Sequence, residues 1–462
     1  MMLLSEAANA INARLIGADA MFTSVGADSR NIRHSQLFVA LKGENFDGHS
    51  FANQAIAHGA AGVLVADGTL SVEPALLVQD TYKALGELAA YWRSKFTMPL
   101  AAITGSNGKT TVKEMLASIL RAAAHNPDQV LATEGNLNNH IGLPLTLLKL
   151  RAQHRYAVAE MGMNHTGEIS YLSKIGKPNV ALINNAGSAH VGELGSFEAI
   201  AKAKGEIFDG LAADGIAVIN ADDNFALLWK TLAARHKTIT FGLKNKADVS
   251  ATYYQLQASA SLLDIATPQG AIKVHLPTPG LHNVLNALAA TAAAQAMGAP
   301  LAAIATGLEN YTGVKGRLQP LAGLNGALVI DDSYNANPMS MKAAIDVLMA
   351  KPGKKILVLG DMGELGENAA ELHAEIGAYA QAAGVDALLT LGNLSESMTK
   401  VFDAEKDTRA KHYLSVSALT ADLIKQMQPD TTVLVKGSRF MAMERVVNEI
   451  TNKADHKNGE KH

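Results

Sequence analysis

Short apolar runs recur along the chain, and each is followed by a turn rich in Gly, Asp or Asn and then by a stretch with helical spacing. In the middle of the chain these runs are residues 100–103, 156–159, 180–183 and 216–219. Strands that are apolar on both faces are typical of parallel sheets covered by helices. The alternation therefore predicts a parallel-sheet α/β unit over residues 98–314.

The same pattern continues toward the C-terminus. Apolar runs at residues 327–330, 356–359, 387–391 and 432–435 each precede a Gly- or Asp-rich turn and a helical stretch. This order predicts an open, doubly wound, Rossmann-like sheet over residues 315–455, with ligands bound at the carboxyl ends of its strands. Residues 456–462 form a polar tail.

The first 97 residues show a different pattern of apolar and polar positions. Apolar runs at residues 36–41 and 62–65 are separated by segments rich in Gly, Asp and His. A helical pattern over residues 82–96 ends before Met98-Pro99, where Pro disfavours continuation of the helix. We expect a smaller α/β unit, so the fold class is α/β with three domains.

One long uncharged run, from Val284 to Leu308, raises the question of a membrane span. It consists mostly of Ala, which contributes little to insertion, and it is interrupted near Gly298-Ala299-Pro300. We expect two buried helices of a globular unit instead.

Composition narrows the class of protein. The formal net charge of the 462 residues is −3, which gives no electrostatic support for a nucleic-acid partner. The Cys count is 0, so disulfides and a cysteine nucleophile are excluded, as expected in a reducing compartment. The N-terminus lacks the basic start and apolar core of a signal peptide. We expect a cytoplasmic protein that binds no nucleic acid and does not insert into a membrane.

The clearest chemical motif is a glycine-rich loop between the apolar run 100–103 and an amphipathic helical pattern. Its residues are Gly105, Ser106, Asn107, Gly108, Lys109, Thr110 and Thr111. Glycines let successive backbone N–H groups converge on phosphate oxygens, and the helix N-terminus adds the positive end of its dipole. Lys109 supplies a cation for the terminal phosphates and Thr110 a hydroxyl for Mg²⁺. The alternative, a turn that merely begins a helix, does not explain Lys-Thr-Thr in this context.

The loop is shorter than the common P-loop, because Ile103 stands where the first Gly should be. In this it resembles the ATP loop of the Mur ligases and folylpolyglutamate synthetases. The resemblance implies an ATP-dependent ligase that activates a carboxylate as an acyl phosphate, joins it to an amine, and uses two Mg²⁺ ions.

Three further residues are candidates for the metal site. Glu160 ends an apolar strand beside the loop, a suitable place for a Mg²⁺ ligand. His190 follows another strand, and by resemblance helps to hold the second Mg²⁺. The resemblance also implies a lysine carbamylated by CO₂. Lys204 is our choice, with Lys202 as the fallback, although two lysines on a helix more often form a solvated face.

Other segments resemble the nucleotide-binding parts of the family. Asn283, in His282-Asn283-Val284-Leu285-Asn286-Ala287, is expected to contact the adenine, Arg317 the phosphates and Asp332 the ribose. All three assignments are implied by the resemblance.

Within the family, the chain resembles the members that add D-alanyl-D-alanine to UDP-N-acetylmuramoyl-tripeptide in peptidoglycan synthesis. This rests on residues 134–144, 332–338 and 360–366 and on Asp28-Ser29-Arg30 near the N-terminus. The implied contacts with the UDP-linked substrate are Ser29, Arg30, Lys42, Asn136, Asn138 and His140. Weaker candidates for the dipeptide are Asn335, Asn337 and the loop 436–439. We expect a monomer.

Three alternatives remain open. Another Mur ligase would share most of these motifs. A folylpolyglutamate synthetase would leave the first 95 or so residues unexplained. A P-loop switch protein would use Asn-Lys-x-Asp to read guanine, and Asn245-Lys246-Ala247-Asp248 has this form. However, the same four residues recur at 452–455, and we expect no buried strand end before the first copy.

Overall fold

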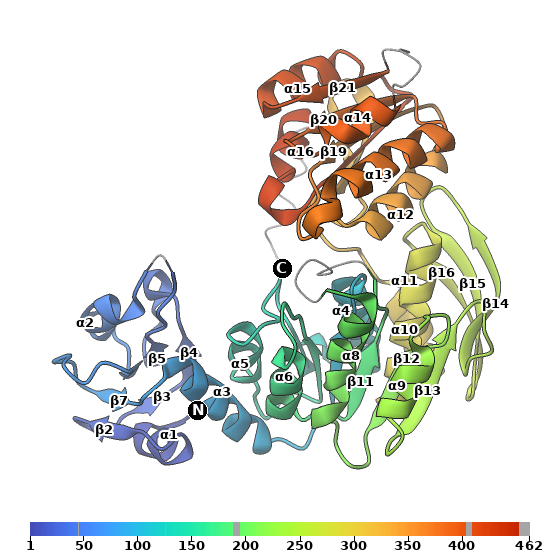
Figure 1. Ribbon diagram of the computed structural model, residues 1–462. Coiled ribbons are helices and arrows are strands. Elements are labelled where there is room, and N and C mark those ends of the chain that lie inside the picture. Colours follow the sequence, from blue (N-terminus) through green and yellow to red (C-terminus); the bar gives the residue numbers. More distant parts are fainter. Residues whose placement is uncertain (45, 125, 188–194, 403–408, 452–462) are drawn as a thin grey trace.

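The computed structural model describes the chain except for residues 45, 125, 188–194, 403–408 and 452–462. Figure 1 shows three units, each built around its own sheet: the N-terminal unit in blue, the central unit in green and yellow, and the C-terminal unit in orange and red. The α/β fold class is confirmed. The predicted polar tail lies outside the described residues.

The N-terminal unit has a five-stranded sheet in the order β2-β7-β6-β5-β4, antiparallel between β2 and β7 and otherwise parallel. Two short strands, β1 and β3, pair separately. The bounds are β1 Met2–Leu3, α1 Leu4–Ala10, β2 Arg14–Ile16, β3 Met21–Phe22, β4 Ser24–Gly26, β5 Gln36–Val39, α2 Ala52–Ala57, β6 Gly62–Val65, β7 Ala75–Leu77 and α3 Thr81–Ser94.

Helix α3 joins the first unit to the second. It packs against α5 and α6 of the central unit, and the Trp92 indole N–H donates to the Leu150 carbonyl at 3.1 Å. The Arg93 guanidinium donates to the carbonyls of Gly176 and Phe96. The buried bonds to Leu150 and Gly176 join α3 of the N-terminal unit to the central unit.

The central unit has a nine-stranded sheet in the order β16-β15-β14-β13-β12-β11-β8-β10-β9. The strands from β9 to β14 in this order are parallel, and β15 is antiparallel to both of its neighbours, β14 and β16. The bounds are β8 Leu100–Thr104, α4 Lys109–Ala123, β9 Val130–Ala132, α5 Gly142–Leu147, β10 Tyr156–Glu160, α6 Glu168–Gly176, β11 Val180–Ile183, α8 Phe197–Gly205, β12 Ile216–Asn220, α9 Ala226–Leu232, β13 Lys237–Gly242, β14 Val249–Leu256, β15 Ser261–Thr267, β16 Gly270–Leu276, α10 Leu281–Ala296 and α11 Leu301–Glu309.

The two faces of this sheet explain why its strands are apolar throughout. Ala101 and Ile103 of β8 belong to one buried cluster with residues of α4 and α10, whereas Leu100 and Ala102 belong to the cluster on the opposite face. Both faces are covered by helices, so neither face of the strand carries polar residues.

The C-terminal unit has a six-stranded sheet in the order β17-β18-β22-β19-β20-β21, parallel except between β17 and β18. All four predicted strands are present. The bounds are β17 Gln319–Ala322, β18 Leu328–Asp332, α12 Pro338–Met349, β19 Lys354–Gly360, α13 Ala369–Ala383, β20 Ala387–Leu391, α14 Glu396–Phe402, β21 Ala410–Tyr413, α15 Val416–Ile424, β22 Thr431–Lys436 and α16 Glu444–Ile450.

The uncharged run forms α10 and α11, as expected, and none of the helices in the described part of the chain has the length and apolar character that a membrane crossing requires. Helix α8 ends at Gly205, and a 3₁₀ segment, Glu206–Gly210, follows it. This segment packs closely on α6, where the Ser173 hydroxyl accepts from the Gly210 N–H at 3.2 Å.

Candidate active site

A cavity of about 970 Å³ lies between the central and C-terminal units. The structure brings many of the predicted site residues to its walls. They are Ser106, Asn107, Gly108, Lys109, Thr111, Asn136, Asn138, Glu160, Lys204, Asn283, Arg317, Asp332, Asn335 and Asn337. Ser29, Arg30, Lys42 and His140 do not line this cavity among the described residues, and His190 lies outside them.

The glycine-rich loop connects β8 to α4, and two of its glycines are required by the geometry. Gly108 has a φ of +77°, and a Cβ there would lie 2.4 Å from Asn286 Oδ1 and 2.6 Å from Asn184 Nδ2. Gly105 has a φ of +156° and passes close to Asn184. Only glycine adopts these conformations without strain and leaves room for the neighbouring amides.

Two asparagines after β11, Asn184 and Asn185, hold the loop in place, and no motif in the sequence predicts this role. The Asn107 N–H donates to Asn185 Oδ1 at 2.8 Å, and the Asn184 and Asn185 side chains both donate to the Asn107 carbonyl. The Ser106 N–H donates to the Asn185 carbonyl at 3.0 Å. The loop is therefore held by hydrogen bonds to the neighbouring strand end.

Lys109 folds back over the loop. Its Nζ donates to the Gly105 carbonyl at 2.7 Å. Burial lowers the pKa of Lys109, although the negative charge of Glu160 opposes the shift. The ammonium lies at the start of α4, where the helix dipole also favours an anion.

Glu160 ends β10 and is 2% exposed. The Thr110 hydroxyl donates to its Oε2 at 2.8 Å, and the Asn138 side chain donates to its Oε1 at 2.8 Å. The predicted metal ligands Thr110 and Glu160 are therefore in direct contact, and Asn138 belongs to the same cluster.

This cluster has the donors that Mg²⁺ prefers. Among the described residues no group of three or more His, Asp and Glu side chains gathers as a metal site. Mg²⁺, however, usually takes one or two protein carboxylates and completes its shell with waters and phosphate oxygens. A buried carboxylate and a hydroxyl beside a phosphate loop fit that requirement.

The two candidate lysines of α8 differ sharply. Lys202 is exposed, and its Nζ lies 2.8 Å from Glu198 Oε1. Lys204 is buried and lines the cavity. Burial, reinforced by the charge of Lys109, holds the pKa of Lys204 well below its ordinary 10.5, which favours the neutral amine.

The C-terminal unit contributes Arg317 to the phosphate loop. Arg317 Nη2 donates to Thr110 Oγ1 at 3.0 Å, and its guanidinium carbon lies 4.4 Å from the centre of the Tyr334 ring. Stacking on an aromatic ring orients a guanidinium in a way that a lysine would not share.

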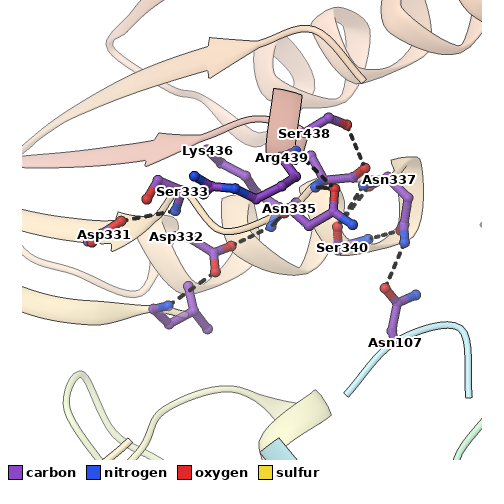
Figure 2. A network of polar contacts seen from close by, with 12 residues as sticks. Asn107, Asp331, Asp332, Ser333, Asn335, Asn337, Ser340, Lys436, Ser438 and Arg439 are labelled. Atoms are coloured by element: carbon purple, nitrogen blue, oxygen red, sulfur yellow. Dashed lines mark hydrogen bonds and ion pairs between the residues drawn. The ribbon is translucent and has the colours of Figure 1, made fainter. Parts of the chain in front are cut away.

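Figure 2 shows the polar network at the carboxyl ends of β18 and β22. Lys436 Nζ lies 2.7 Å from Asp332 Oδ2, and the other carboxylate oxygen accepts the Leu318 N–H. Lys436 also donates to the Asn335 carbonyl at 2.8 Å. Asp332, the predicted ribose acceptor, is thus held by a buried ion pair that the sequence did not indicate.

Asn337 joins this network to the phosphate loop. Its Oδ1 accepts the Ser340 N–H and so caps α12, while its Nδ2 donates to Asn107 Oδ1 at 2.7 Å (Figure 2). Asn335 instead accepts the Ala336 and Arg439 N–H groups within its own unit.

Asn283 begins α10 beneath the cavity. Its Nδ2 donates to the Pro279 carbonyl at 2.8 Å, and its Oδ1 accepts from Asn286 at 3.3 Å. Asn286 in turn accepts from Asn184 at 3.0 Å. A chain of amides thus links the predicted adenine contact to the phosphate loop.

The predicted UDP-substrate residues of the first unit lie away from the walls of this cavity. Arg30 and Asp28 make two hydrogen bonds of 2.9 Å, and this contact lowers the pKa of Asp28 to about 2. The Lys42 carbonyl accepts from the Tyr82 hydroxyl at 2.8 Å. The Tyr82 ring lies 5.5 Å from the ring of His140. Tyr82 therefore connects Lys42 to the loop that carries His140.

The Asn-Lys-x-Asp segment does follow a strand, contrary to our expectation. It begins three residues after Gly242, the buried last residue of β13. Its Asp248 accepts the N–H and the hydroxyl of Thr240, both at 2.7 Å, and Asn245 donates to the Ala221 carbonyl. Asn245 and Asp248, which a guanine site would need, are therefore bound to Ala221 after β12 and to Thr240 of β13.

Comparisons with known proteins cover most of the chain. Residues 103–294 match the model of the Mur ligase middle domain, residues 316–439 that of the Mur ligase glutamate ligase domain, and residues 21–93 that of the Mur ligase family catalytic domain. The UDP-N-acetylmuramoyl-tripeptide–D-alanyl-D-alanine ligase of Escherichia coli is 43% identical over 448 residues, which are 96% of this chain and 97% of that protein.

Solved structures agree with this match. The crystal structure of MurF from Acinetobacter baumannii is similar with a TM-score of 0.88 at 38% identity, covering 96% of this chain and 97% of that one. MurF ligase from Thermotoga maritima, solved in complex with ADP, has a TM-score of 0.81 at 29% identity, covering 92% and 96% of the two chains.

Proposed function

The chain belongs to the Mur ligase family, and we propose that it adds D-alanyl-D-alanine to UDP-N-acetylmuramoyl-tripeptide, converting ATP to ADP and phosphate. The observation that carries this proposal is one cavity in which a phosphate loop, a buried carboxylate and Arg317 of the C-terminal unit meet. The full-length similarity to ligases of that name supports the choice of substrates. We also propose a cytoplasmic location, which the absence of Cys fits.

The reaction proceeds in two steps. The terminal carboxylate of the tripeptide attacks the γ-phosphorus of ATP, giving an acyl phosphate and ADP. Lys109, the loop N–H groups and Arg317 offset the repulsion between carboxylate and triphosphate. The dipeptide amine then attacks the acyl carbon, loses a proton, and expels phosphate. The phosphate loop is already held by hydrogen bonds to Asn184 and Asn185. Positioning of the reactants therefore supplies much of the rate acceleration.

Thr110 and Glu160 would hold Mg²⁺, which when bound neutralises charge on the phosphate oxygens. Their direct contact and the burial of Glu160 support this assignment. The proposal of a second Mg²⁺ rests on the family resemblance through His190.

Lys204, rather than Lys202, is the proposed site of carbamylation. The neutral amine attacks CO₂ and loses a proton, which leaves a carbamate in place of a cation. The burial of Lys204 and its lowered pKa support the choice of this residue, and the exposed ion pair of Lys202 argues against Lys202. Mass spectrometry of the intact protein at neutral pH should show the mass of one CO₂ lost on acidification, and Lys204→Met should abolish it while Lys202→Met should not.

Phosphate release tests the function directly. The UDP-tripeptide is supplied with ATP, and D-alanyl-D-alanine, D-alanine and L-alanyl-L-alanine are offered in turn. We expect release that depends on D-alanyl-D-alanine. Release without that dependence would reject the dipeptide assignment and leave another ligase of the family as the alternative. Tripeptides that end in lysine and in diaminopimelate identify the accepted third residue.

A further inference from the structure

Helix α4 carries a lysine deep inside the central unit. Lys113 is 0% exposed, and its helix neighbours Val112 and Met115 are equally buried among apolar side chains. Its Nζ donates to the Thr133 carbonyl at 2.6 Å and lies 2.5 Å from Glu114 Oε1. The two steps of the proposed reaction do not use this ammonium.

Thr133, the residue that Lys113 holds, is a junction between two parts of the site. It follows β9 directly, and its N–H donates to the Val158 carbonyl at 3.0 Å. Its hydroxyl accepts the Glu160 N–H at 3.0 Å. The segment that continues from Thr133 contains Asn136 and Asn138, both of which line the cavity.

Two further hydrogen bonds, which do not involve Thr133, join the loop 134–140 to the end of β10. The Gly162 N–H donates to the Asn138 carbonyl at 2.8 Å, and the Asn138 side chain donates to Glu160. A displacement of Thr133 would therefore move Glu160 and the loop 134–140 together.

A contribution to stability alone does not explain a charge at this position. Replacement of a buried ion pair by apolar side chains is often neutral or stabilising. The carboxylate partner also has access to water, because the Glu114 side chain is 30% exposed. What an apolar side chain could not provide is a donor aimed at the Thr133 carbonyl.

We propose that Lys113 is a positioning residue, which fixes Thr133 and through it places the loop 134–140 on the substrate side of the cavity, next to the proposed Mg²⁺ ligand Glu160. The inference rests on the proposed function, because that loop is taken to bind the UDP-linked substrate. ATP is held by the glycine loop at the start of α4. The residues that hold this loop follow β11 or belong to α10. Loss of the ammonium should therefore affect one substrate more than the other.

Lys113→Met tests this separation, because methionine fills the space without a donor. We expect KM for the UDP-tripeptide to rise about tenfold, the value of one charged hydrogen bond. KM for ATP should rise less, because the Glu160 carboxylate keeps its hydrogen bond from Thr110. Lys149→Met is the matched control. Its Nζ lies 2.7 Å from Glu134 in the same loop, but the pair is exposed, so both KM values should stay near wild type.

Thr133→Val provides a second test that leaves the buried lysine in place. It removes the hydroxyl that accepts the Glu160 N–H, and KM for the UDP-tripeptide should rise in the same direction. Equal KM values in Lys113→Met and wild type would overturn the inference, and so would an unchanged KM in Thr133→Val if Lys113→Met fails to fold. A wild-type protein inactive with both substrates would overturn the proposed function as well, which separates the two failures.

Discussion

The side chain of Asn337 donates to the side-chain oxygen of Asn107 at 2.7 Å, although the two residues are 230 positions apart. One belongs to the phosphate loop of the central unit and the other begins α12 of the C-terminal unit. The same side chain that caps a helix thus connects that unit to the nucleotide loop.

Asn337→Ser separates these two roles. Serine still caps α12 by accepting the Ser340 N–H, but it is too short to reach Asn107. We expect kcat/KM for ATP to fall about five- to tenfold, as for one net hydrogen bond of about 1 kcal/mol, with little change in Tm. Asn337→Ala should lose the same activity and, in addition, about 1 kcal/mol of unfolding free energy from the cap. Steady-state phosphate release and urea unfolding distinguish the two variants.

Gly108→Ala should disrupt nucleotide binding. The new Cβ would meet both Asn286 and Asn184, and the positive φ adds backbone strain. We expect a loss of about 1–3 kcal/mol in stability and a large rise in the Kd for ADP, measured by calorimetry. Gly298→Ala is the control, because Gly298 also has a positive φ, +81°, but no atom within 4 Å of the added carbon. A normal Kd in Gly108→Ala would contradict the steric argument.

Arg317→Lys should lower kcat by about tenfold or more even though it keeps the charge. Lysine cannot both stack on Tyr334 and present a planar donor to Thr110. Tyr334→Phe keeps the ring and should preserve most of the rate, whereas Tyr334→Ala should approach the effect of Arg317→Lys. Single-turnover ADP formation is the appropriate measurement. If Arg317→Lys were as fast as wild type, charge alone would account for the role of Arg317.

His373 should make the C-terminal unit sensitive to acid. The ring is 0% exposed, Nε2 accepts the Met362 N–H at 2.8 Å, and Nδ1 contacts the Ala369 carbonyl at 2.6 Å. Burial lowers the pKa of His373, so the folded state keeps it neutral while the unfolded state gains a proton below about pH 6.5. This contribution to stability is complete above 6.5 and declines as the pH falls toward the lowered value.

Urea unfolding at pH 7.5 and 5.5 measures the effect. His373→Gln removes the titrating ring, so its stability should fall less between the two pH values than that of the wild type. Since Met362 precedes Gly363 and Glu364 of the cavity wall, the wild type should also lose activity reversibly on the acid side. Parallel pH profiles for the two proteins would exclude His373 as the source.

Much of the fold was predictable because each apolar run in the parallel sheets is buried on both faces. Leu100, Ala101, Ala102 and Ile103 are an example, since they are uniformly apolar and alternate between two clusters. The antiparallel extension β14–β16 was missed. Tyr253 and Tyr254 of β14 are exposed, and the buried positions of β15 and of the end of β16 alternate with partly or fully exposed ones, so no continuous apolar run marks these strands.

Some residues of the candidate site could likewise be predicted from the sequence, and others could not. Gly108 and Glu160 could be found because a local pattern, a loop or a strand end, accompanies each of them. The contact of Lys113 with the Thr133 carbonyl and the pairing of Lys436 with Asp332 could not, because a lysine carries no local signal that its ammonium will be buried against a distant partner. The contact between Asn107 and Asn337 depends on how two units meet, which no single segment encodes.

The hydroxyl of Thr110 has one proton and two lone pairs. The proton is directed to Glu160, and one lone pair accepts from Arg317. A cation that binds this oxygen can use only the remaining lone pair, unless the Arg317 guanidinium moves away. Retreat of the C-terminal unit would vacate that position without disturbing the bond to Glu160. The number of lone pairs that Thr110 Oγ1 can offer to a cation therefore depends on whether the central and C-terminal units are in contact.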